Sequence, residues 1–235
     1  FPDIIIEDEL ADKFFDEYID LVVFRDLIER HQIKNVFVVR YLIKSLLSSF
    51  SKEFSVNKVF NDLKSQNIKI SKKTLYNYLS YLEDTFFGFS LNKFSYSMKT
   101  SGLSISKAFI NDTGLVNSVL TNFSENIGKL MENQVFLELL RKKYNESNIE
   151  LFYWKDRGRE VDFILKKGEK IRKLIQVCYS IEHKETKKRE VDALIKSSKE
   201  LNCENLIIIT WDYEGEEKIN EKKIKFIPLW KWLLN

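Results

Sequence analysis

Three strand-like segments follow one another between residues 149 and 180, and short turns carrying a glycine separate them. They read IELFYWKDRG, REVDFILKKG and KIRKLIQVCYS. Apolar residues recur near alternate positions, a pattern typical of strands that bury one face. Strands joined by such short turns pair antiparallel with their neighbours in the sequence. The chain therefore predicts an antiparallel meander, which constrains its fold more than any other feature.

Helical patterns lie on both sides of the meander. Residues 127–145 place apolar side chains along one side of a helix, and residues 186–201 predict a second helix with Thr186 as N-cap. The run ENLIIITWD then predicts a buried strand, and KIKFIPLWKWLLN a last strand with a short helix. The order helix, three strands, helix, strand is that of the restriction-endonuclease-like, or PD-(D/E)XK, core.

Composition fits a globular chain. Hydrophobic residues make up 44% and charged residues 31% of the 235 residues, so the chain can bury a sizeable core. No apolar run approaches the roughly 20 residues that span a bilayer. Two cysteines and two histidines are too few for a Cys/His zinc site, and we expect a reducing cytoplasm. The acidic start without a methionine leads us to expect a fragment of a longer polypeptide.

Charge is unevenly distributed along the chain. Residues 1–35 carry four basic and ten acidic side chains, whereas residues 36–110 carry eleven basic and four acidic ones. The remainder is close to neutral, and the whole chain has a net charge of +3. A basic middle segment is a reason to look for nucleic acid there, although lysine-rich surfaces are also common without it.

The basic segment reads as three helices followed by a pair of strands. Asn35, Ser55 and Ser71 are expected N-caps for these helices, and Asp8 or Asp12 for a helix before them. The stretch FFGFSLNKFSYSMKT predicts a hairpin that turns around residues 91–93. Three helices and a strand pair in fewer than about 80 residues are typical of a winged helix-turn-helix.

The sequence thus predicts a chain of the α+β or α/β class in three parts. Residues 1–34 form an acidic connecting helix, residues 35–106 a winged helix-turn-helix, and residues 107–235 a PD-(D/E)XK-like mixed-sheet domain.

The third helix of the basic segment is the candidate DNA-binding element. It extends from Ser71 to Tyr81. Its outward-facing residues include Lys72, Lys73, Tyr76 and Asn77. Lysines near a helix N-terminus favour phosphates, and an asparagine can read an adenine edge. The competing interpretation is that the winged helix only packs between domains.

A nuclease of this fold needs an acidic helix residue, an aspartate on the second strand and an (E/Q)-x-K pair on the third. Glu132 and Asp162 fill the first two positions, with Glu160 on the Asp162 face. Gln176 begins the pair, and Cys178 stands where the lysine belongs. Carboxylate oxygens bind Mg²⁺, so Glu132 and Asp162 are the candidate metal ligands, and Glu132, Asp162 and Gln176 the candidate catalytic positions.

The missing lysine makes cleavage doubtful. A thiol near its ordinary pKa is neutral at pH 7 and does not replace an ammonium that stabilises charge on the phosphate. The double change Gln176→Glu with Cys178→Lys would place the missing pair on one face of the strand. Alternatively, Lys184, Lys187 or Lys188 could supply the cation from the next helix.

Several segments resemble one known family. GKLMENQVFLELLR, YWKDRGREVDFIL, IQVCYSI and TKKREVDAL are similar to the C-terminal half of archaeal and bacterial AAA-type P-loop ATPases. The resemblance implies an ATPase module before this chain, followed by a connecting helix, a winged helix and a restriction-endonuclease-like domain. No G-x-x-x-x-G-K-[ST] loop occurs here, so we expect no ATP hydrolysis by this chain alone.

Three functions remain open. The first is a nucleic-acid-binding or partner-recognition module of an ATPase with a silent nuclease-like domain. The second is a Mg²⁺-dependent nuclease with a relocated lysine, and the third is a protein-interaction scaffold that binds no nucleic acid. We expect no membrane contact. Trp154, Trp211, Trp230 and Trp232 are expected in the core, and Asp212 in a turn.

Overall fold

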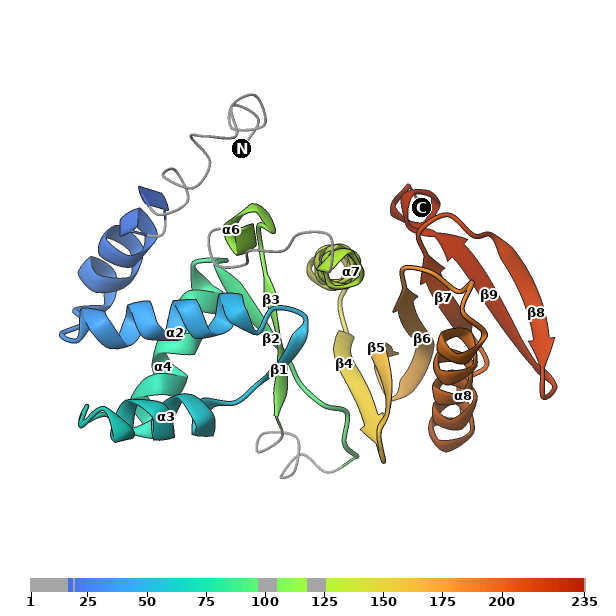
Figure 1. The fold of residues 1–235 in the computed structure, drawn as a ribbon, viewed down its shortest axis with the longest axis horizontal. Coiled ribbons are helices and arrows are strands. Elements are labelled where there is room, and N and C mark those ends of the chain that lie inside the picture. Colours follow the sequence, from blue (N-terminus) through green and yellow to red (C-terminus); the bar gives the residue numbers. More distant parts are fainter. Residues whose placement is uncertain (1–16, 19, 97–104, 118–125, 235) are drawn as a thin grey trace. The chain divides into compact units, whose positions relative to one another are not determined.

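The computed structural model describes residues 17–18, 20–96, 105–117 and 126–234. They form two compact units, which we describe separately (Figure 1). The N-terminal unit holds the described residues up to 90 together with 106–117, and the C-terminal unit holds 91–96, 105 and 126–234. The N-caps expected at Asp8 and Asp12 lie outside the described residues. None of the described helices is long and apolar enough to cross a membrane.

The N-terminal unit is mainly helical and carries a small sheet. Its helices are η2 (Val22–Glu29, with π geometry), α2 (Val36–Ser48), α3 (Val56–Ser65), α4 (Lys72–Asp84) and α6 (Gly114–Asn117). Its strands are β1 (Lys52–Phe54), β2 (Gly88–Leu91) and β3 (Ser106–Ile110), in the order β1-β3-β2. The side chains of Asn35, Ser55 and Ser71 accept backbone N–H bonds at the starts of α2, α3 and α4, which confirms the three N-caps.

The predicted hairpin around residues 91–93 is wrong. The strand that returns beside β2 is β3, which lies in the middle of the sheet and pairs antiparallel with β1. The residues expected in the second arm pair elsewhere: Phe94 N–H donates to Tyr153 O at 2.7 Å, and Tyr153 N–H donates to Asn92 O at 3.1 Å. Alternating apolar residues predict extended chain, but they do not choose its partner.

Helix α4 buries one side and exposes the other. Leu75, Tyr78, Leu79 and Leu82 face the core of the N-terminal unit. Phe86, four residues after Leu82, would lie on the same side if the helix continued, but it is 54% exposed. The helix has ended by then, and Phe86 adopts a φ of 56°, so the helical repeat no longer directs its side chain.

The C-terminal unit is a mixed six-stranded sheet with helices. Its strands are β4 (Ile149–Asp156), β5 (Arg159–Lys167), β6 (Lys170–Cys178), β7 (Leu206–Thr210), β8 (Gly215–Ile219) and β9 (Lys222–Pro228). Its helices are α7 (Ile127–Asn145), α8 (Lys184–Leu201) and α9 (Leu229–Leu233). The sheet order is β4-β5-β6-β7-β9-β8.

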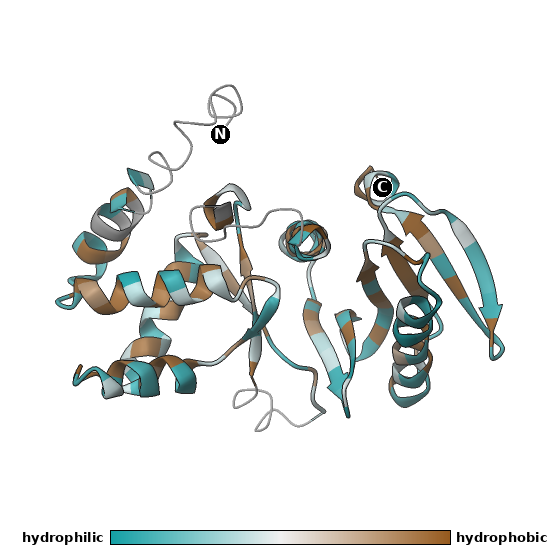
Figure 2. Cartoon of the chain, in the orientation of Figure 1, coloured by the Kyte–Doolittle hydropathy of each residue, from teal (hydrophilic) through white to brown (hydrophobic). Residues whose placement is uncertain are grey.

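The strand directions confirm the predicted meander. Strands β4, β5 and β6 are antiparallel neighbours, whereas β7 runs parallel to both β6 and β9. Strand β8 was not predicted, because its charged sequence GEEKI forms an exposed edge antiparallel to β9 (Figure 2). Helix α8 begins earlier than expected, with His183 rather than Thr186 as N-cap.

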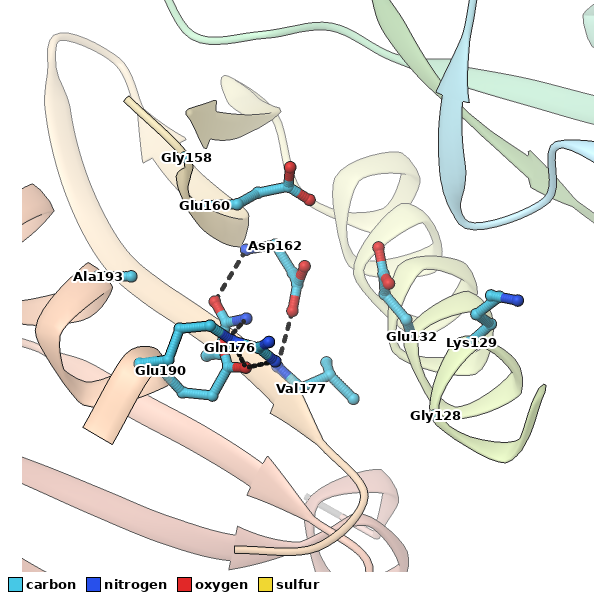
Figure 3. Close-up of a pocket in the computed structure, with 11 residues that line it drawn as sticks. Gly128, Lys129, Glu132, Gly158, Glu160, Asp162, Gln176, Val177, Glu190 and Ala193 are labelled. Atoms are coloured by element: carbon cyan, nitrogen blue, oxygen red, sulfur yellow. Dashed lines mark hydrogen bonds and ion pairs between the residues drawn. The ribbon is translucent and has the colours of Figure 1, made fainter. Parts of the chain in front are cut away.

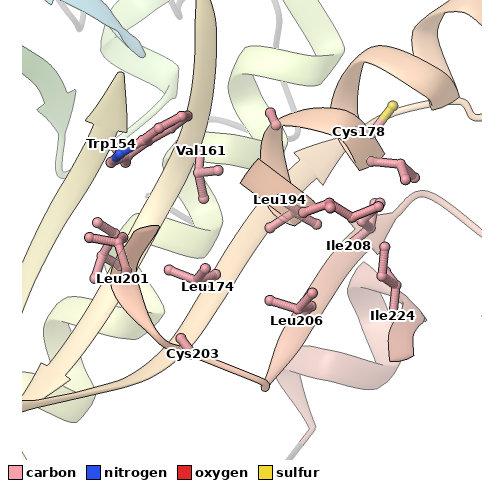
Figure 4. Close-up of a cluster of buried hydrophobic side chains, with 14 of the residues drawn as sticks. Trp154, Val161, Leu174, Cys178, Leu194, Leu201, Cys203, Leu206, Ile208 and Ile224 are labelled. Atoms are coloured by element: carbon pink, nitrogen blue, oxygen red, sulfur yellow. The ribbon is translucent and has the colours of Figure 1, made fainter. Parts of the chain in front are cut away.

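The core of the C-terminal unit includes the space between the sheet and α8. Val191 and Leu194 of α8 pack there with Leu174 and Ile208 from β6 and β7 (Figure 4). Trp154 belongs to this cluster, as the sequence predicted, and is 3% exposed.

Two of the four tryptophans depart from the core prediction. Trp232 is buried, but Trp211 is 50% exposed and Trp230 60% exposed. Both lie just beyond the end of a strand, where the chain leaves the sheet.

We expect Ser71→Ala to destabilise the N-terminal unit. The Ser71 hydroxyl accepts the Thr74 N–H bond at 3.0 Å, and loss of such a cap costs about 1 kcal/mol of unfolding free energy. Urea titration of the intact chain, followed by circular dichroism, measures the change. Ser71→Asp is the control, because aspartate also caps a helix; an alanine variant as stable as the wild type would contradict the assignment.

Candidate functional site

A β-bulge positions Asp162. Phe152 pairs with Ile164 and Trp154 pairs with Val161, so two residues of β5, Asp162 and Phe163, oppose a single residue of β4. A bulge of this kind turns a side chain out of the regular alternation. The pairing of β5 with β6 begins only at Phe163, so Asp162 lies where the two strands separate.

Side chains replace the backbone ladder at this point. The Val177 N–H donates to Asp162 Oδ2 at 2.9 Å, and the Asp162 N–H donates to Gln176 Oε1 at 3.2 Å. Both side chains are buried, each about 5% exposed. Buried backbone N–H groups require partners, so these contacts stabilise the separation of the strands.

The network continues into α8. Gln176 Nε2 donates to Glu190 Oε2 at 2.7 Å (Figure 3). The Arg189 guanidinium donates to Glu190 Oε1 from Nε at 3.1 Å and from Nη2 at 2.6 Å. Burial raises the pKa of Glu190, and the nearby Asp162 carboxylate adds to this, while Arg189 opposes it. We call Asp162, Gln176, Arg189 and Glu190 the polar network.

The polar network lines a cavity of about 420 Å³. Glu132 from α7 and Glu160 from β5 line it as well (Figure 3). The structure thus brings together every residue that the sequence assigned to the nuclease-like positions except Cys178. Glycines 128 and 158, Lys129, Val177 and Ala193 complete the lining.

Cys178 lies outside the cavity lining. Its thiol is packed in the cluster with Val191 and Leu194 and donates to Ser180 O at 3.2 Å (Figure 4). Burial, with a contribution from Glu190, raises the pKa of Cys178 to about 11, so the thiol is neutral at pH 7. A lysine at position 178 would have to bury its ammonium among apolar side chains, which is costly. The structure therefore gives no support to the double change Gln176→Glu with Cys178→Lys as a repair of the site.

The cations near the cavity are not the ones that sequence reasoning named. Lys187 forms an ion pair with Glu217 at 2.5 Å, and neither Lys184 nor Lys188 lines the cavity. Its basic lining residues are Lys129, whose ammonium donates to Asn126 Oδ1, and Arg189.

Sequence reasoning missed Arg189 and Glu190. The signal was present, because Glu190 comes directly before Val191 and four residues before Leu194 on the face of α8 that packs on the sheet. A carboxylate at such a buried helical position needs polar partners, which points to a network.

The carboxylates in the cavity do not form a metal-binding group of three among the described residues. Across the described residues, no group of three or more His, Cys, Asp or Glu side chains is placed to hold a metal ion. Asp162 Oδ2 and both ends of the Gln176 amide have protein partners. The expected pair of ligands, Glu132 and Asp162, shares the cavity with Glu160 and Glu190, but among the described residues no three of these carboxylates are placed to hold one ion.

The residues assigned to DNA lie on α4 in the N-terminal unit. Lys72, Lys73, Tyr76 and Asn77 are all exposed. The Lys72 ammonium lies 5.2 Å from the centre of the Phe60 ring of α3, which holds it beside the helix start.

The neighbouring tyrosines of α4 have structural contacts. Tyr78 is buried, and Tyr81 stacks on His31 with ring centres 3.6 Å apart.

Family models match nearly the whole length of the chain in two parts. Residues 1–126 match a domain of unknown function, DUF8612, and residues 127–232 match another, DUF4143. An uncharacterised protein of the archaeon Methanocaldococcus jannaschii is 43% identical over an alignment of 242 residues, which covers 100% of this chain and 53% of that protein. An uncharacterised protein of Haemophilus influenzae is 26% identical over 231 residues, which cover 98% of this chain and 55% of that protein. The chain thus spans about half the length of these relatives.

The raised pKa of Glu190 makes a pH-dependent contribution to stability. Because the folded protein binds this proton more readily than the unfolded chain, the contribution is full below the ordinary pKa of 4.5 and declines as pH rises through the raised value. Glu190→Gln removes the titration. The unfolding free energy of the wild type minus that of the variant should therefore fall as the pH increases above 4.5, in urea titrations at several pH values.

The exposed Glu185 of the same helix provides the control. Glu185→Gln removes a carboxylate without touching the polar network, so its difference from the wild type should change little over this range. A difference for Glu190→Gln that rises with pH would mean that Arg189 outweighs burial.

Proposed function

We propose, from the premise that this chain belongs to the family of the domain of unknown function DUF8612, that it is the DNA-binding part of a longer protein. The observation that carries the proposal is the exposed face of α4, where Lys72, Lys73, Tyr76 and Asn77 project from a helix anchored by its opposite side. The function assigned to the C-terminal unit is recognition without cleavage.

The arrangement around α4 supports a winged helix-turn-helix. Helices α2, α3 and α4 precede the second and third strands of a sheet ordered β1-β3-β2, with β1 between α2 and α3. In that fold the third helix enters the major groove while the others hold it. Leu75 and Leu79 keep α4 on the core, which leaves its other face available to DNA.

The chemistry of the exposed face fits duplex DNA. Lys72 and Lys73 lie in the first turn of α4, where the helix dipole and the free N–H groups also attract phosphate. Asn77 lies one turn further on and has the donor and acceptor that an adenine edge requires in the major groove. Phosphate contacts would set affinity and register, and Asn77 would add base preference.

A silent PD-(D/E)XK-like domain is the proposal for the C-terminal unit. Its element order and the bulge at Asp162 support that fold assignment. The hydrogen bonds within the polar network occupy groups that a metal-dependent nuclease would use, and Cys178 supplies no cation. This favours a structural role for the network over the alternative of a nuclease with a relocated lysine.

An ATPase module is the proposed covalent partner. The resemblance to AAA-type ATPases implies such a module before this chain, and the relatives are almost twice as long as the aligned part. In this proposal the ATPase module hydrolyses ATP outside this chain. Helix α4 binds the DNA on which that module acts.

Exchange of Lys72 and Lys73 for alanine should weaken DNA binding at every sequence tested. The dependence of log affinity on log salt should flatten by about one unit for each phosphate that the protein no longer neutralises. Fluorescence anisotropy with a labelled duplex at several salt concentrations measures both quantities.

A matched control carries Lys218→Ala and Lys225→Ala. These exposed lysines lie on β8 and β9, so the control has the same change in net charge without touching α4. If the control loses as much affinity as the α4 variant, or if the wild type does not bind duplex DNA at low salt, the scaffold interpretation prevails.

Plasmid nicking tests the silent nuclease-like site. We expect the wild type to nick supercoiled DNA no faster than buffer with either Mg²⁺ or Mn²⁺, because loss of one positioned charge-stabilising group commonly costs about 10²–10³ in rate. Asp162→Ala is the comparison. Nicking by the wild type that this variant lacks would establish the nuclease and overturn the silent-site proposal.

A further inference from the structure

Three parallel strands of the C-terminal unit end at the same level. Cys178 of β6 pairs with Thr210 of β7, and Thr210 pairs with Pro228 of β9. The residues that follow therefore leave the sheet along one edge. In sheets of parallel strands, ligands commonly bind beyond these carboxyl ends.

Large aromatic residues gather along this edge in exposed positions. We call Tyr179, Trp211, Tyr213 and Trp230 the aromatic edge; they are 44%, 50%, 40% and 60% exposed. Tyr179 and Trp211 have ring centres 5.7 Å apart. The backbone N–H of Trp211 donates to the backbone carbonyl of Tyr179 at 3.3 Å. Such a concentration of exposed rings is typical of binding surfaces, where tyrosine and tryptophan are enriched.

A cavity of about 480 Å³ opens beside these rings. Tyr179 and Tyr213 line it together with Glu182, Lys187, Thr210 and Asp212. It shares no lining residue with the cavity of the polar network. The aromatic edge is therefore separate from the nuclease-like positions.

The Tyr213 ring is held in place without a ligand. It lies edge-on to Phe226 with ring centres 5.4 Å apart, and its phenol hydroxyl donates to Glu217 Oε1 at 3.4 Å. The ring also packs so closely on Gly215 that a Cβ there would come within 2.9 Å of the phenol oxygen. A wall fixed in this way loses little conformational entropy when it binds something.

The charge balance of the cavity is negative. Glu182 and Asp212 are exposed, and within the described part of the chain neither carboxylate has an ion pair. The charge of Lys187 is offset by Glu217 at 2.5 Å, so it does not neutralise them. Carboxylates beside ring faces repel phosphate and attract cations.

We propose that the aromatic edge binds an arginine side chain presented by a segment of a partner polypeptide. A guanidinium is planar, stacks on aromatic rings and donates several hydrogen bonds at once. Here it would stack against Tyr179 and donate to Asp212 and Glu182, because the Lys187 ammonium already lies over the Tyr213 ring. A lysine ammonium is a compact, strongly hydrated charge that does not stack, so it fits less well.

This proposal is independent of DNA binding through α4. The surface belongs to the C-terminal unit and uses no residue of the basic helix. It gives the chain a second binding surface, of opposite charge, for a protein segment.

A hexa-arginine peptide is the probe, with isothermal titration calorimetry on the intact chain. The test variant carries Glu182→Gln and Asp212→Asn, which keep side-chain shape at exposed positions. We expect the wild type to bind hexa-arginine about tenfold more tightly than this variant, and more tightly than it binds hexa-lysine. Trp211→Ala should weaken the peptide as well, because the aromatic edge loses a ring.

The control variant carries Asp84→Asn and Glu185→Gln. It loses the same two charges at exposed positions outside the cavity, so its affinity should match that of the wild type. Equal loss of affinity in both variants would mean that overall charge attracts the peptide, and the proposal would be wrong. Binding of oligo(dT) that Trp211→Ala abolishes, without peptide binding, would instead identify a base-stacking surface and overturn it.

Discussion

The hydrogen bonds between Asp162 and the β6 residues Gln176 and Val177 determine the shape of the C-terminal unit around its cavity. Where the β5–β6 ladder stops, these side chains satisfy the backbone groups that the two strands no longer exchange. Glu190 is buried there because Gln176 and Arg189 donate to it. A buried polar network is stable only when each member has its partners, so the loss of one leaves the others unsatisfied.

This constraint gives the nuclease-like positions a role in the fold. The carbonyl oxygen of Gln176 and one oxygen of Asp162 accept backbone N–H bonds between β5 and β6, and these bonds stabilise the fold where the strands separate. Cys178, in the place of a lysine, contributes to apolar packing. The polar network thus supports the fold at the positions that the sequence assigned to a nuclease-like site, and this supports the proposal of a domain that binds rather than cleaves.

Periodicity and capping residues predicted most of the elements. The meander followed from alternation and short turns. Ser55 and Ser71 marked helix starts because their hydroxyls accept hydrogen bonds from backbone N–H groups in the first turn. The spacing of Asp162 and Gln176 also predicted that these side chains meet, since the meander fixes their strands as neighbours, and Glu132 of α7 lines the same cavity. Long-range pairing was not predictable in the same way. Nothing local in Ser106–Ile110 shows that β1 and β2 flank it, and the exposure of Trp211 depends on where a strand ends rather than on its hydrophobicity.

The order of strands in the small N-terminal sheet determines when this sheet can form during synthesis of the chain. Its middle strand, β3, is the last of the three to leave the ribosome, after the segment that pairs with Tyr153 of the C-terminal unit. Until then β1 and β2 have no common partner, and α2, α3 and α4 pack without a complete sheet beneath them. The N-terminal unit therefore cannot be released as one uninterrupted stretch that ends at residue 90. A shortened gene product that stops after α4 would expose the apolar surface that Phe109 and Ile110 contact in the full chain, and would be prone to aggregate.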